Sequence, residues 1–144
     1  MSKIFLMTKG GRVNLIEFFM PMIPPETTHQ QKKVSVVNGK PHFYEPVELK
    51  AARSKLMSHL GPHSPNGKMV GSLRLTVKWC FPITGDHYDG EYKYTKPDTD
   101  NLQKLLKDCM TDLSFWKDDA QVASEIAEKF WAKIPGIYIR IEGI

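Results

Sequence analysis

Residues 73–81 alternate without a break between apolar and other side chains. The odd positions all carry apolar residues, namely Leu73, Leu75, Val77, Trp79 and Phe81. Successive side chains of a β-strand point to opposite faces, so this period of two predicts a strand with one buried face. A sheet with one apolar face needs a second layer to cover it.

Two amphipathic segments are predicted as helices that supply this layer. From Pro46 to Leu60, apolar residues recur every three to four positions, and Gly61 follows as a stop signal. At about 100° per residue, the segment from Asn101 to Leu113 gathers its leucines, Cys109 and Met110 on one arc. The opposite side of this helix holds Asp100, Lys104 and Lys107.

Five further strands are predicted from β-forming residues between turn signals: 13–20, 33–37, 40–44, 121–133 and 136–142. Asn38-Gly39 joins two of them and is typical of a two-residue hairpin turn. The order β-ββ-α-β-α-ββ predicts an α+β fold, a two-layer sandwich with a mixed β-sheet packed against two helices.

Length and composition exclude several classes of protein. The 144 residues, 41% of them hydrophobic, suit one domain with an ordinary core, so residues 1–144 are expected to form one unit. The longest apolar stretches are far short of the roughly 18 residues of a membrane span. The start lacks a secretory signal, and we expect a cytoplasmic protein. Two cysteines without metal-binding spacing argue against a zinc finger or a disulfide framework.

The charge changes sign along the chain. Residues 1–97 hold 14 basic and 7 acidic side chains, whereas residues 98–144 hold 6 and 9. The formal net charge of +4 therefore hides a positive part and a negative part. Six of the nine acidic residues of the negative part fall within residues 96–122.

This acidic segment predicts a metal site. Asp98 and Asp100 are two residues apart, so in an extended segment both carboxylates project to one side. Two hard oxygen ligands suit Mg²⁺, which binds one or two carboxylates, several waters and substrate phosphate. Lys104 lies one turn further along the helix, where it can neutralise a phosphate oxygen.

Ordinary structural roles also account for these residues. Aspartates before an apolar run are typical helix caps. Lys104 and Lys107 can form exposed ion pairs with Asp100 or Asp108, which contribute little stability. The pair Asp118-Asp119 is of a kind common in surface loops.

Two segments, KPDTDNLQK (96–104) and FWKDDAQV (115–122), together resemble the signature of the RusA family of Holliday junction resolvases. The resemblance implies a small homodimeric endodeoxyribonuclease, of a kind often encoded by phages and prophages. Such enzymes cut four-way DNA junctions symmetrically in recombination and repair, with Mg²⁺ as cofactor and Mn²⁺ as an alternative ion.

The resemblance also implies roles for single residues. Asp98, Asp100 and Asp119 match the catalytic metal ligands, and Lys104 matches the essential lysine, with Asp118 as an accessory group. A helix of thirteen residues is roughly 20 Å long, and the six residues that follow can return about the same distance. Closure within one chain is therefore tight, unless the helix is shorter, Asp119 approaches at an angle or a partner subunit contributes it.

The positive part of the chain is expected to face DNA, because a carboxylate-rich site repels phosphates. The candidate phosphate contacts lie in predicted loops or the hairpin and comprise Lys32, Lys33, Lys40, Lys68, Lys93 and Lys96. Solubility alone also accounts for any one of them. Tyr88, Tyr92 and Tyr94 are candidates for stacking on unpaired bases, although packing roles are more frequent.

Two other functions fit the same residues. In a non-catalytic DNA-structure binding protein, the aspartates would cap the helix and the basic residues would hold the DNA. A Mg²⁺ nuclease could instead act on other branched DNA. Dependence of cleavage on Mg²⁺ separates the binder from the enzymes.

Overall fold

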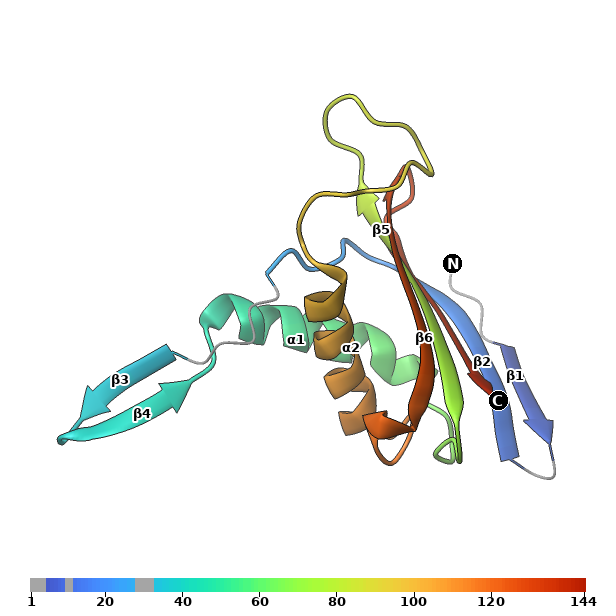
Figure 1. Ribbon diagram of the computed structural model, residues 1–144, viewed down its shortest axis with the longest axis horizontal. Coiled ribbons are helices and arrows are strands. Elements are labelled where there is room, and N and C mark those ends of the chain that lie inside the picture. The colour runs from blue at the N-terminus through green and yellow to red at the C-terminus, as the bar shows by residue number, and fades with distance from the viewer. Residues whose placement is uncertain (1–4, 10–11, 28–32) are drawn as a thin grey trace.

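The computed structural model describes residues 5–9, 12–27 and 33–144 and contains a five-stranded sheet covered on one side by two helices (Figure 1). The strands of this sheet are β1 (Phe5–Lys9), β2 (Arg12–Pro21), β5 (Leu73–Pro82), β6 (Val122–Ala132) and β7 (Gly136–Gly143). The helices are α1 (Val47–Leu60) and α2 (Thr99–Asp112). Parallel and antiparallel pairs both occur, so the predicted α+β fold with a mixed sheet and two helices is confirmed.

Strands β3 (Lys33–Val37) and β4 (Lys40–Tyr44) form a separate two-stranded sheet that extends beyond α1 (Figure 1). The turn residues Asn38 and Gly39 have φ angles of 52° and 76°, which is the conformation that the Asn-Gly pair predicts. The hairpin is therefore confirmed with its predicted bounds. The short strand β1, which pairs with β2 at one edge of the main sheet, was not predicted.

The sheet has the strand order β1-β2-β7-β5-β6, and β5 and β6 run parallel. Parallel neighbours need a crossover connection, and α2 provides it. The helix therefore runs back alongside the two strands, over part of their length (Figure 1). Although β6 and β7 are consecutive in the chain, β5 separates them in the sheet.

The core lies between the sheet and the helices. Every odd-numbered residue of β5 from Leu73 to Phe81 is buried, as the alternation predicts. The apolar arc of α2 is buried as well, including Leu102, Leu105 and Leu106. The polar side of α2 is consequently left on the surface. Within the described residues, no helix has the length and apolar character needed to cross a membrane.

Candidate active site

Helix α2 begins at Thr99, two residues earlier than predicted, and this changes the placement of the first two aspartates. Asp98 is the N-cap residue, with an extended backbone, and Asp100 lies in the first helical turn. The expectation that both residues lie on one extended segment was therefore wrong. Yet the Asp98 side chain makes no capping hydrogen bond, so capping does not account for this carboxylate.

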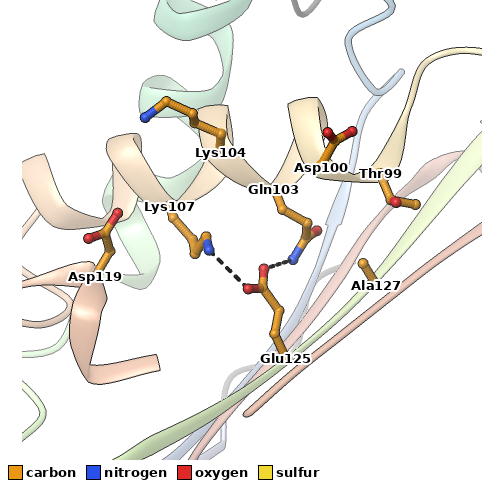
Figure 2. Close-up of a pocket in the computed structure, with 8 residues that line it drawn as sticks. All are labelled: Thr99, Asp100, Gln103, Lys104, Lys107, Asp119, Glu125 and Ala127. Carbon is orange, nitrogen blue, oxygen red and sulfur yellow. Dashed lines mark hydrogen bonds and ion pairs between the residues drawn. The ribbon is translucent and has the colours of Figure 1, made fainter. Parts of the chain in front are cut away.

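A surface cleft of about 440 Å³ runs along α2 beside β6 (Figure 2). Its lining includes Asp100, Lys104 and Asp119 from the predicted site. Asp100 and Asp119 lie at opposite ends of the cleft, with the two lysines of α2 between them (Figure 2). Asp98 is exposed next to the cleft and is not part of its lining. The remaining lining residues are Thr99, Gln103, Lys107, Glu125 and Ala127.

A chain of hydrogen bonds links the cleft to the core. The buried indole of Trp79 donates to the Gln103 side chain at 2.7 Å, and Gln103 donates to the Glu125 carboxylate at 2.6 Å. Lys107 donates to the other oxygen of Glu125 at 2.9 Å (Figure 2). Each of these groups has a partner, which fixes their orientation in the cleft.

Glu125, Gln103 and Lys107 were not predicted as site residues. The sequence does contain a signal for Gln103. In a helical projection this residue lies only about 20° from Met110, at the border of the apolar arc, which predicts a polar side chain next to the core. No such signal exists for Glu125, whose position opposite α2 depends on the parallel pairing of β6 with β5.

Lys104 extends from the outer side of α2 at the rim of the cleft. Its ammonium lies 3.6 Å from the Asp108 carboxylate, and 60% of its side chain is exposed. An ion pair this exposed is weak, so the ammonium is free to move to another anion.

Residues 118–121 form a short turn, and the side chains of Asp118 and Gln121 stabilise it by hydrogen bonds. Asp118 caps the 3-10 helix Asp119–Gln121 by accepting a hydrogen bond from the Ala120 N–H at 2.8 Å. Gln121 accepts from the Lys117 and Asp118 N–H groups and donates to the carbonyls of Met69 and Gly71. Capping therefore explains the position of the Asp118 carboxylate, whereas it does not explain that of Asp98. Asp119 is left to face the cleft (Figure 2).

The three predicted ligands do not converge within one chain. Among the described residues, no three His, Cys, Asp or Glu side chains are placed to hold one metal ion. The reason is the crossover, because the 14 residues of α2 separate its ends by roughly 21 Å. Asp98 and Asp100 lie at one end of the helix and Asp119 lies beyond the other end.

The chemistry of the first two aspartates nevertheless fits a divalent ion. Both side chains are exposed, and among the described residues neither forms a hydrogen bond that caps the helix. Carboxylate oxygens two positions apart at a helix N-terminus suit Mg²⁺, which keeps several waters and needs only one or two protein carboxylates. Asp98 and Asp100 are therefore the residues that could hold the metal.

The predicted phosphate contacts differ in accessibility. Lys40, Lys68 and Lys96 are exposed, whereas Lys32 and the side chain of Lys33 lie outside the described part of the structure. Lys93 is only 8% exposed, and its ammonium donates to Thr95 Oγ1 and to the Lys96 carbonyl. These internal partners correct the expectation that Lys93 contacts DNA.

The three candidate stacking tyrosines lie in the loop that leads into α2. Tyr88, Tyr92 and Tyr94 are 68%, 62% and 88% exposed, so none of them is a core residue. Tyr92 is partly engaged, because its hydroxyl donates to Glu128 and its ring stacks on Phe130.

Comparison with known proteins identifies the family. A family model described as endodeoxyribonuclease RusA matches residues 22–142. A crossover junction endodeoxyribonuclease rusA of Lactococcus phage r1t is 34% identical over 115 residues, which cover 78% of this chain and 85% of the phage protein. The uncharacterized protein YqaN of Bacillus subtilis (strain 168) is 27% identical over 121 residues, which cover 76% and 84% of the two chains. The chain therefore belongs to the RusA endodeoxyribonuclease family.

Proposed function

We propose that this protein is a Mg²⁺-dependent, structure-specific endodeoxyribonuclease that resolves four-way DNA junctions by symmetric phosphodiester hydrolysis. The observation that carries the proposal is the pair Asp98 and Asp100 at the N-terminus of α2, beside a cleft that also holds Lys104. This pair lies within the region that matches the family model. The phage relative that spans most of the chain is named a crossover junction endodeoxyribonuclease.

Asp98 and Asp100 would hold the metal ion, with Asp119 as a further ligand. When bound, Mg²⁺ supplies a Lewis acid that polarises the phosphate and makes a coordinated water more acidic. The carboxylates must hold their oxygens at fixed positions for this, and the start of α2, with Asp98 as N-cap and Asp100 in the first turn, favours such an arrangement. Mn²⁺ has similar ligand preferences and is expected to substitute.

Lys104 would stabilise the charge that develops on the phosphate during hydrolysis. Lys104 lies four residues after Asp100, and its side chain extends from the rim of the same cleft (Figure 2). Its present partner, Asp108, is held only by an exposed ion pair. A phosphate in the cleft would therefore compete successfully for this ammonium.

A second copy of the chain would complete the site. Within one chain, α2 keeps Asp119 away from Asp98 and Asp100, so the third carboxylate would come from Asp119 of the other copy. A C2 homodimer places equal surfaces in reciprocal contact and thereby produces two equivalent sites. Two equivalent sites are what symmetric cleavage of a four-way junction requires.

The exposed lysines near the cleft would hold the DNA backbone. Lys96 precedes the aspartate pair, and Lys68 lies next to Met69, whose carbonyl accepts from Gln121. These two lysines flank opposite ends of α2. Phosphate contacts of this kind are independent of base sequence and weaken as salt increases.

Matched synthetic DNA substrates test the proposal. We expect paired nicks in a four-way junction with Mg²⁺, much less cleavage of three-way and linear duplexes, and none when EDTA removes the metal. The variant Asp100→Asn should lose activity by on the order of a hundredfold or more, because one metal ligand is lost. Asp86→Asn, which changes an exposed aspartate in the loop after β5, is the control and should cut normally.

The same assay distinguishes the other functions. A protein that binds junctions equally with and without Mg²⁺ and never nicks them is a DNA-structure binder. Comparable cutting of flaps or three-way junctions would indicate a nuclease for branched DNA in general. Full activity in Asp100→Asn would contradict the metal site.

A further inference from the structure

Two lysines bind the main chain just before the aspartate pair. The Lys129 ammonium, from β6, donates to the carbonyls of Thr95 and Pro97 at 2.5 and 2.6 Å. The Lys93 ammonium donates to Thr95 Oγ1 at 2.5 Å and to the Lys96 carbonyl at 2.7 Å. The carbonyls of three successive residues therefore all accept a hydrogen bond from an ammonium group.

The two lysines are themselves held in place. The Lys93 N–H donates to the Lys129 carbonyl at 2.9 Å, and Tyr92 forms an antiparallel bridge with Phe130. The Lys93 ammonium also lies 4.5 Å from the ring centroid of Trp131. This segment thus docks on the edge of β6, which places both ammonium groups against residues 95–97.

The ammonium groups of Lys93 and Lys129 repel each other, so hydrogen-bond acceptors or negative charges must stabilise them. Burial lowers the pKa of Lys93 below its ordinary value, and the charge of Lys129 lowers it further. Burial also lowers the pKa of Lys129, whereas the nearby Asp98 carboxylate raises it. The Lys129 ammonium thus lies within electrostatic reach of Asp98, the residue that directly follows Pro97.

We propose that Lys129 and Lys93 are positioning residues that fix residues 95–97 and thereby orient the Asp98 carboxylate for metal binding. Neither ammonium is placed to contact substrate, because each already donates to groups of the loop. The inference rests on the proposed function, since it assigns these lysines a role toward the same metal site.

Binding of Mn²⁺ to the intact protein, followed by electron paramagnetic resonance, tests this role without DNA. In Lys129→Met, we expect the Kd for Mn²⁺ to rise roughly tenfold or more, as is typical when a residue that orients a metal ligand is lost. Lys129→Arg should bind Mn²⁺ nearly as well as the wild type, because a guanidinium can donate to two carbonyls. Lys133→Met, at an exposed position after β6, is the control.

Cleavage gives a second measurement. With Lys129→Met, the Mg²⁺ concentration for half-maximal rate should rise, while the rate at saturating Mg²⁺ should stay close to that of the wild type. A purely structural role would lower the Tm of the metal-free protein and leave the Kd of the folded protein unchanged.

An unaltered Kd for Mn²⁺ in folded Lys129→Met would overturn the inference. If that variant does not fold, Thr95→Val removes one acceptor of Lys93 and tests the same loop, and an unchanged Kd in folded Thr95→Val overturns the inference equally. If the wild type binds Mn²⁺ and Lys129→Met binds it weakly, but the wild type cuts no branched DNA, the positioning role stands and the proposed function fails.

Discussion

Asp118 and Asp119 are adjacent and chemically identical, but the structure gives them different surroundings. Asp118 accepts a hydrogen bond from the backbone and caps a turn, whereas Asp119 faces the cleft beside α2. A carboxylate that accepts from the backbone stabilises the fold, and one that faces a cleft is available to a ligand. The two residues should therefore respond differently to substitution.

We expect Asp118→Ala to lower the free energy of unfolding by about 1 kcal/mol, the usual effect of losing an N-cap. Asp119→Asn should leave this free energy nearly unchanged and abolish junction cleavage. Urea unfolding and the cleavage assay measure the two effects. Asp118→Asn keeps a capping oxygen and should remain active. If it is as inactive as Asp119→Asn, the charge of Asp118 serves the metal and capping is not its main role.

At this scale the sequence predicts which carboxylates belong to the candidate site but not their surroundings. Asp98 and Asp100 stand out by their spacing, and the resemblance to the family signature adds Asp119, because such a motif is a local property. The hydrogen bonds from Trp79 through Gln103 to Glu125 join three separate elements. Such contacts depend on the strand order, which no local pattern specifies.

Among the elements, β7 shows how closely two neighbouring strands approach each other. Gly136, its first residue, pairs with Pro21 at the end of β2. A Cβ added at Gly136 would lie 2.2 Å from Phe19 Cζ and 2.6 Å from the carbonyl oxygen of Met20. A ring can rotate away, but a backbone oxygen within a paired strand moves only if the pairing changes.

Gly136→Ala is therefore expected to lower the free energy of unfolding by about 1–3 kcal/mol, the range for overpacking a filled site. The gain from a less flexible unfolded chain, about 0.4–1 kcal/mol, is smaller. Gly143→Ala, at the other end of β7, is the matched control, because its Cβ would meet no atom closer than 3.8 Å. Equal urea midpoints for the two variants would contradict this reading of the strand.

Elements defined by local patterns were predicted well. The alternation in β5, the arc of α2 and the Asn38-Gly39 turn each depend on residues close together in the chain, and all three are confirmed. The parallel pairing of β5 with β6 depends instead on which strands meet in the sheet. That pairing decides where Asp119 lies, so the geometry of the site could not be predicted.

For the whole molecule, the crossover through α2 has a consequence for assembly. The helix separates the aspartate pair from Asp119, so the proposed site with three carboxylates would draw on two chains. The charge distribution is compatible with this arrangement, because the acidic cluster lies in the negative part of the chain and the exposed lysines considered for DNA lie in the positive part. A dimer would surround each acidic site with basic surface from both copies.

Mixing two inactive variants tests whether the site is shared. In a mixed dimer of Asp100→Asn and Asp119→Asn, one site carries both substitutions and the other carries none, provided that Asp119 acts across the dimer. After random subunit exchange, about a quarter of all sites should be intact, and these should cut one strand of a junction and leave the other uncut.

A mixture of Asp98→Asn with Asp100→Asn is the matched control, because every site then retains one substitution in the aspartate pair and no activity should return. If the first mixture stays as inactive as its parents although mixed dimers form, Asp119 does not act across the dimer. Recovery of single-strand nicks only in the first mixture would show that the distance imposed by α2 is spanned by a second copy of the chain.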